Sequence, residues 1–145
     1  MKRININSQQ THFIGCWNLE NNKLCNEIIN LFENNKNLQI QGITDKGIDP
    51  KTKKTTDIPV SPNDLKKPKF EILKKYIGEL HKCFLDYQNQ WPFLKSMFNT
   101  LYVPSFNIQK YLPGDHFAAL HSERTSINTS HRLFAWMTYL NDVDD

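Results

Sequence analysis

Two residues with metal-binding side chains, His121 and Glu123, are separated by a single residue in this sequence of 145 residues. Residues i and i+2 of an extended chain project from the same face, so an imidazole and a carboxylate at this spacing can reach one metal ion. Two histidines and one carboxylate on one face of an octahedral iron(II) ion leave three positions open for other ligands. The pair therefore suggests two ligands of an iron site; the alternative is a surface histidine beside a surface glutamate.

The residues around this pair follow a wider pattern. Tyr111, Gly114 and Phe117 precede it, and Arg132 and the run Tyr139-Leu140-Asn141-Asp142 follow it. The order resembles the front half of the prolyl-hydroxylase-like 2-oxoglutarate- and iron(II)-dependent oxygenases. That family carries a tyrosine and a turn glycine before a His-x-Asp motif, then an arginine-led strand that ends in Tyr-Leu-Asn. Within the family, the sequence is most similar to marine-microbial and phage-type members, which share the forms of residues 107–114 and 121–124.

The resemblance implies a role for each matching residue. His121 and Glu123 would be the first two iron ligands, and the Tyr139 hydroxyl would bind the distal carboxylate of 2-oxoglutarate. Arg124 would meet the substrate or a neighbouring acid, and the two readings stay open. The implied cofactors are Fe(II), 2-oxoglutarate as cosubstrate and O₂, and the implied reaction hydroxylates a C–H bond of a peptide or small molecule. The residues expected to line the cosubstrate pocket are Tyr111, Tyr139, Asn107, Gln109 and Met137, although either tyrosine could instead be an ordinary core aromatic.

The sequence departs from the family pattern in two ways. Glu123 stands where most members carry aspartate, so the chain must sit slightly farther from the iron. No residue matches the distal histidine or the later basic residue that pairs with 2-oxoglutarate, and His116 and His131 fall at no ligand position. We therefore expect a chain truncated at its C-terminus, and a non-catalytic fragment or binding module of the family is the alternative function.

Periodicity predicts the elements that position these residues. Apolar residues at helical spacing predict one helix that begins after Asn21 or Asn22 and another over residues 70–90. Period-two alternation predicts a strand from Phe106 to Tyr111. Short apolar stretches predict further strands over 11–17, 38–43 and 132–140. The proline-rich, charged stretch 42–69 is interpreted as a long loop that could cover the site.

The expected fold class is α+β. The resemblance implies one domain over residues 1–145, a double-stranded β-helix (jelly roll) whose later core strands are missing. Residues 1–104 would supply supporting helices, and 105–145 the first core strands. An open sheet of this kind would expose an unpaired edge, so self-association is expected.

The composition of the chain indicates which classes of protein it is compatible with. Hydrophobic residues make up 39% of the chain, and no apolar run approaches the length of a membrane span. Three separated cysteines without a CxxC pair indicate reduced thiols and a cytoplasmic location. Residues 45–75 hold nine lysines against five acids, but few aromatics lie among them, so a nucleic-acid-binding module is the last-ranked reading.

Overall fold

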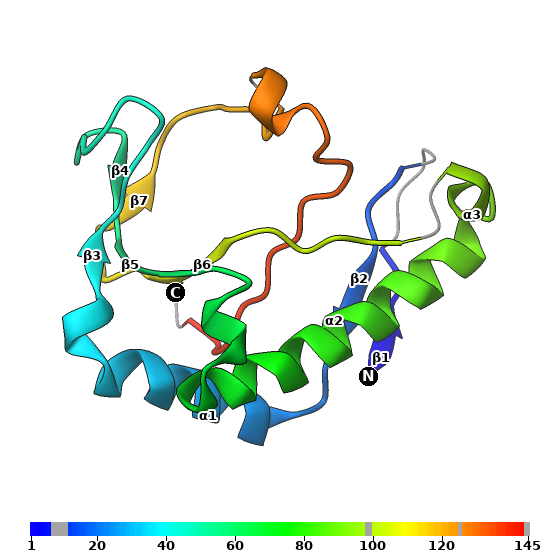
Figure 1. Ribbon diagram of the computed structural model, residues 1–145, viewed down its shortest axis with the longest axis horizontal. Coiled ribbons are helices and arrows are strands. Elements are labelled where there is room, and N and C mark those ends of the chain that lie inside the picture. Colours follow the sequence, from blue (N-terminus) through cyan, green and yellow to red (C-terminus); the bar gives the residue numbers. More distant parts are fainter. Residues whose placement is uncertain (7–11, 98–99, 125, 144–145) are drawn as a thin grey trace.

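Two amphipathic helices, α1 (Asn22–Asn34) and α2 (Glu71–Gln90), form one layer of the protein (Figure 1). The computed structural model describes residues 1–6, 12–97, 100–124 and 126–143. α1 begins where the Asn21 side chain accepts a hydrogen bond of 3.1 Å from the backbone N–H of Leu24. This bond satisfies one of the free donors of the first turn. Both helices predicted from periodicity are therefore confirmed.

Three small antiparallel sheets accompany the helices. The strands are β1 (Lys2–Ile4), β2 (Cys16–Asn18), β3 (Ile40–Gln41), β4 (Lys53–Lys54), β5 (Thr56–Val60), β6 (Phe106–Lys110) and β7 (His116–Phe117). β1 pairs with β2, β4 pairs with β7, and the third sheet has the order β3–β5–β6. The α+β class is confirmed, and the sheets formed by the described residues do not close into a barrel.

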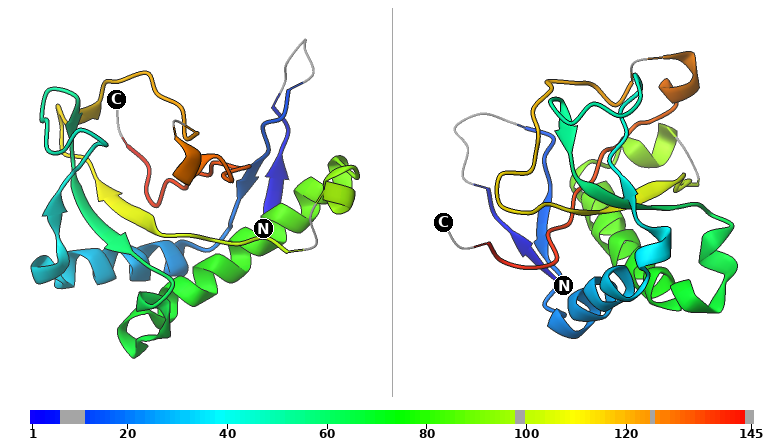
Figure 2. Two further views of the ribbon diagram at one scale, coloured as in Figure 1. Left: turned by 45° about the horizontal axis from the view of Figure 1, so that its top comes forward. Right: turned by 90° about the vertical axis from the view of Figure 1, so that its left-hand side faces the viewer.

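The hydrophobic core lies between the helices and the β3–β5–β6 sheet. The left-hand view in Figure 2 shows α1 and α2 on the same side of this sheet. Each helix and the sheet contribute apolar side chains at their own periodicity. The buried cluster consists of Leu24, Ile28 and Phe32 from α1, Phe70 from the short 3-10 helix before α2, Leu73 and Tyr76 from α2, and Ile58, Val60 and Ile108 from the sheet.

The interpretation of residues 42–69 as a long loop is wrong. This stretch contains β4 and β5, and β5 is the central strand of the three-stranded sheet. Ile58 and Val60 are almost completely buried on one face of β5. Pro59 lacks a backbone N–H, but its opposite partner in the register is Asn107 on β6, and the ladder continues on both sides of this pair. A proline and several charges therefore concealed a core strand.

Of the other predicted strands, one is confirmed and two have different bounds in the structure. The strand at Phe106 is confirmed as β6, with Ile108 buried on the core face. The stretch 38–43 contains only the two-residue β3, because Leu38 belongs to a short 3-10 helix. The stretch 11–17 is wrong in its bounds: β2 begins at Cys16, and Thr11 lies outside the described residues. The remaining short helices are η1 (Lys36–Leu38), η2 (Asp64–Lys66), η3 (Pro68–Phe70), α3 (Leu94–Met97) and η4 (Ile127–Thr129).

The predicted strand 132–140 is an extended segment without a strand partner among the described residues. Its even-numbered side chains face the rest of the protein. The Trp136 indole donates a hydrogen bond of 3.0 Å to the Tyr76 hydroxyl, and the Thr138 hydroxyl lies 2.9 Å from the same oxygen. Met137 and Tyr139 are exposed. The predicted alternation is present, but a strand also needs a hydrogen-bonding neighbour.

Candidate functional site

The two predicted metal ligands, His121 and Glu123, lie side by side in the segment that follows β7. The Nε2 atom of His121 is 3.5 Å from Oε1 of Glu123, and about half of each side chain is exposed. Metal–nitrogen and metal–oxygen bonds of about 2.1 Å place neighbouring ligand atoms of an octahedral ion about 3 Å apart. The observed separation is therefore close to that of two ligands of one ion.

The other ring nitrogen of His121 determines which atom could bind a metal. Nδ1 lies 3.0 Å from the backbone carbonyl oxygen of Ala119. A carbonyl oxygen can only accept, so this contact requires the proton on Nδ1. In the neutral imidazole, Nε2 then carries a lone pair beside the carboxylate of Glu123. A metal ion placed between these two acceptor atoms would be attracted by both of them.

The second carboxylate oxygen of Glu123 is also held. Arg132 donates a hydrogen bond of 2.9 Å from its guanidinium group to Oε2 of Glu123. A hydrogen-bonded carboxylate and a histidine whose second nitrogen contacts a carbonyl are the usual surroundings of metal ligands. Sequence reasoning placed Arg132 only at the start of a strand, and considered Arg124 as the partner of an acid. In the structure, the partner of Glu123 is Arg132.

The described residues supply two donors and not three. No group of three or more His, Cys, Asp or Glu side chains that could hold a metal ion occurs within the ranges that the structure describes. The ring nitrogens of His116 lie 3.3 and 3.1 Å from the backbone carbonyl oxygens of Gly114 and Lys51. His131 is exposed, and neither histidine joins the His121–Glu123 pair. The donor set thus fits part of an iron site.

Two of the five residues predicted to line the cosubstrate pocket, Gln109 and Tyr111, lie near Asp57. The Gln109 side chain donates a hydrogen bond of 3.3 Å to Oδ2 of Asp57. Partial burial raises the pKa of the Tyr111 hydroxyl, and the nearby Asp57 carboxylate and Tyr139 side chain raise it further. Asp57 and Tyr139 therefore both lie near the Tyr111 hydroxyl. In the part of the chain that the structure describes, no hydrogen bond or ion pair links Asn107 or Met137 to them.

A buried ion pair between Lys53 and Asp57 lies between the two groups of predicted residues. Lys53 Nζ is 2.7 Å from Oδ2 of Asp57, and the Thr55 hydroxyl donates a hydrogen bond of 2.7 Å to Oδ1. Sequence reasoning missed all three residues. Their spacing was the available signal, because positions i, i+2 and i+4 of an extended chain share one face.

The lysine-rich segment 45–75 is partly neutralised by carboxylates. Four of its nine lysines form ion pairs with other described residues, which are Lys53–Asp57, Lys54–Asp115, Lys67–Asp64 and Lys74–Glu71. These pairs reduce the positive charge available to a nucleic acid backbone.

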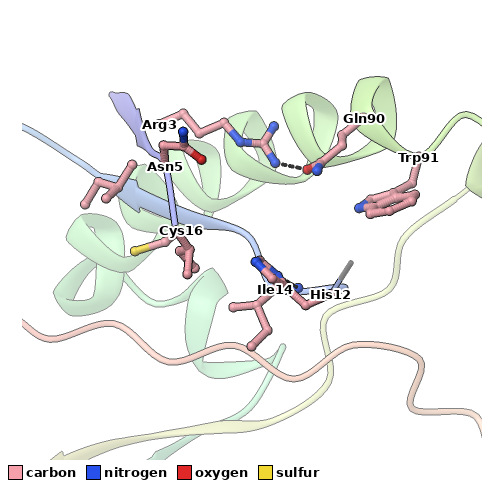
Figure 3. A pocket seen from close by; sticks show the side chains of 9 residues that line it. Arg3, Asn5, His12, Ile14, Cys16, Gln90 and Trp91 are labelled. Atoms are coloured by element: carbon pink, nitrogen blue, oxygen red, sulfur yellow. Dashed lines mark hydrogen bonds between the residues drawn. The ribbon is translucent and has the colours of Figure 1, made fainter. Parts of the chain in front are cut away.

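A separate hollow lies between β1, β2 and the C-terminal end of α2 (Figure 3), and none of the predicted site residues lines it. Its volume is about 220 Å³. The guanidinium group of Arg3 is bound to Asp86 and Gln90 there. The indole N–H of Trp91 is buried and has no hydrogen-bond partner among the described residues. Neither His121 nor Glu123 lines this hollow, so it is not part of the proposed metal site.

Comparison of the chain with protein-family models, curated proteins and solved structures gave no match. Among the described residues, none of the helices combines the length and the apolar character needed to cross a membrane.

Proposed function

We propose that this chain provides two iron ligands of a 2-oxoglutarate- and Fe(II)-dependent dioxygenase that hydroxylates a C–H bond. One observation carries the proposal. The Nε2 atom of His121 and Oε1 of Glu123 are 3.5 Å apart, and the second polar atom of each side chain already has a partner in Ala119 or Arg132. The resemblance of residues 106–141 to the prolyl-hydroxylase-like oxygenases names the chemistry that such a pair would serve.

In this proposal, each of the predicted site residues has its own role. Bound iron, 2-oxoglutarate and O₂ would supply the oxidation, which yields succinate, CO₂ and a hydroxylated product. His121 and Glu123 would hold the metal. Tyr111 and Tyr139 would donate hydrogen bonds to the cosubstrate through their phenol hydroxyl groups. Burial raises the pKa of Tyr111, so its hydroxyl keeps the proton that it would donate. Gln109 on β6, two residues before Tyr111, would orient an oxygen of the cosubstrate.

The resemblance also implies a finer fold than the observed α+β arrangement. In a jelly roll, β6 and the extended segment 132–140 would be core strands, and Met137 and Tyr139 would project into the cavity between the sheets. Their exposure on the side away from α2 agrees with this placement. A peptide side chain is the substrate class that the family implies, and it rests on the resemblance alone.

The test is anaerobic visible absorbance of the metal-free chain during addition of Fe(II) and then 2-oxoglutarate. A charge-transfer band that needs both additions would show cosubstrate chelated to bound iron. Replacing His121 or Glu123 by alanine should abolish the band. The matched control is His81→Gln, which removes an exposed imidazole from α2 and should leave the band unchanged.

Two outcomes would count against the proposal. A band of equal strength in His121→Ala would show that the iron binds elsewhere. No band in the wild-type chain, together with no measurable Fe(II) binding, would favour a binding module that performs no iron chemistry.

A further inference from the structure

Lys53 and Asp57 form an ion pair in the interior of the protein. Their residues are 4% and 2% exposed, and Asp57 accepts additional hydrogen bonds from Thr55 and Gln109. Removing two charges from water is unfavourable, and a well-packed apolar pair of similar volume is often at least as stable. The presence of this pair therefore points to a structural effect beyond stability, and its neighbours show which side chain it affects.

The ammonium group of Lys53 lies beside the ring of Phe117. The antiparallel pairing of β4 with β7 sets Lys53 directly opposite Phe117. Opposite residues project from the same face of a sheet. The Lys53 Nζ atom is 5.7 Å from the ring centroid, within the range of a cation–π contact. A hydrogen bond of 2.8 Å from the Ala118 N–H to the Thr52 carbonyl extends the pairing by one residue.

Phe117 in turn stacks on His121. The ring centroids are 4.4 Å apart, and the ring planes differ by 20°. The segment after β7 contains no regular helix or strand before His121. The imidazole is therefore oriented by this stack, by the Ala119 carbonyl and by Glu123. Of these, only the stack connects it to the interior.

We propose that the Lys53–Asp57 pair is a positioning element, which holds Phe117 beneath His121 and thereby directs Nε2 toward Glu123. The inference rests on the proposed function, because it assigns a purpose to the orientation of a metal ligand. Asp57 restrains the ammonium group, the ammonium group restrains the ring of Phe117, and the ring restrains the imidazole. The pair contacts neither metal nor cosubstrate in this role.

The first test uses metal-free protein with ¹³C-labelled histidine. Protons of an imidazole stacked on an aromatic ring resonate upfield, and loss of one signal in His121→Gln assigns them. The double variant Lys53→Met/Asp57→Leu removes both charges without leaving one unpaired. We expect the upfield shift of the His121 protons to decrease by at least half. Lys53→Arg keeps the charge and should keep most of the shift. An unchanged shift in a folded double variant would overturn the inference.

The second test measures Co(II) affinity, and it remains decisive if the double variant fails to fold. Phe117 is 38% exposed, so leucine can replace it without a large cavity. Phe117→Leu removes the aromatic face and should weaken Co(II) binding about tenfold, a loss typical of residues that orient metal ligands. Phe117→Tyr restores the ring and should bind Co(II) within about twofold of wild type. Equal affinity of Phe117→Leu and wild type would overturn the inference.

The two proposals fail in different ways. If the wild-type chain binds neither Fe(II) nor Co(II), the iron function is wrong, whereas the metal-free NMR comparison still decides whether the pair orients His121. If wild type binds metal and the NMR shift is the same in the double variant, the iron function stands and the positioning role is wrong.

Discussion

Replacing Lys53 alone by methionine should destabilise the protein more than replacing Lys53 and Asp57 together. In the single variant, the Asp57 carboxylate stays in the interior, and Thr55 and Gln109 are its remaining partners among the described residues. Removing one member of a buried ion pair typically costs about 3–5 kcal/mol. Because small domains have about 5–15 kcal/mol of total stability, this loss would be a large part of it.

The double variant Lys53→Met/Asp57→Leu should lose far less. Both charges disappear, and the main cost is the Thr55 hydroxyl, which is buried and loses its acceptor. An unsatisfied buried hydroxyl costs about 1–3 kcal/mol. The double variant is therefore expected to be about 2 kcal/mol more stable than the single variant.

Urea unfolding of metal-free protein, followed by circular dichroism at pH 7, measures this difference. The matched control is Lys74→Met, which removes another lysine and its ion pair with Glu71. Since the two side chains of this pair are 47% and 58% exposed, its loss should shift the midpoint much less than Lys53→Met does. The reasoning fails if the double variant is as unstable as Lys53→Met, or if Lys53→Met unfolds at the wild-type midpoint.

Two further outcomes follow from close packing and from a hydrogen-bonded carboxylate. Gly42→Ala would place a Cβ atom 2.1 Å from the Thr55 hydroxyl oxygen and should lower the free energy of unfolding by about 1–3 kcal/mol. In Gly78→Ala the added Cβ meets open space, so this variant should be as stable as wild type or more stable in urea unfolding. The Leu112 N–H lowers the pKa of Asp115 below its ordinary value of 3.8, so Asp115→Asn should be less stable than wild type above that pH. The difference should shrink as the pH falls through the lowered pKa; a constant difference from pH 7 to pH 2 in unfolding experiments would contradict it.

The sequence by itself determined the elements whose signals are local. The α2 stripe repeats every three to four residues, and the alternation around Ile108 repeats every two, so each pattern identifies its element without knowledge of the partner. The spacing of His121 and Glu123 is equally local. Side chains at positions i and i+2 of an extended chain can converge on one point. In the structure, Nε2 of His121 lies 3.5 Å from Oε1 of Glu123.

Only the tertiary structure decided what β4 and β5 are. Lysine and aspartate are normally solvated, so Lys53 and Asp57 beside a proline suggested a loop. They are buried because each supplies the charge that the other needs. The periodicity of the sequence does not predict that the two charges are buried together. The tertiary structure likewise decided that residues 132–140 have no ladder partner among the described residues, since a strand requires a neighbour at hydrogen-bonding distance. The pairing of β4 with β7 is also visible only in the tertiary structure: it sets Lys53 opposite Phe117, whose ring stacks on His121.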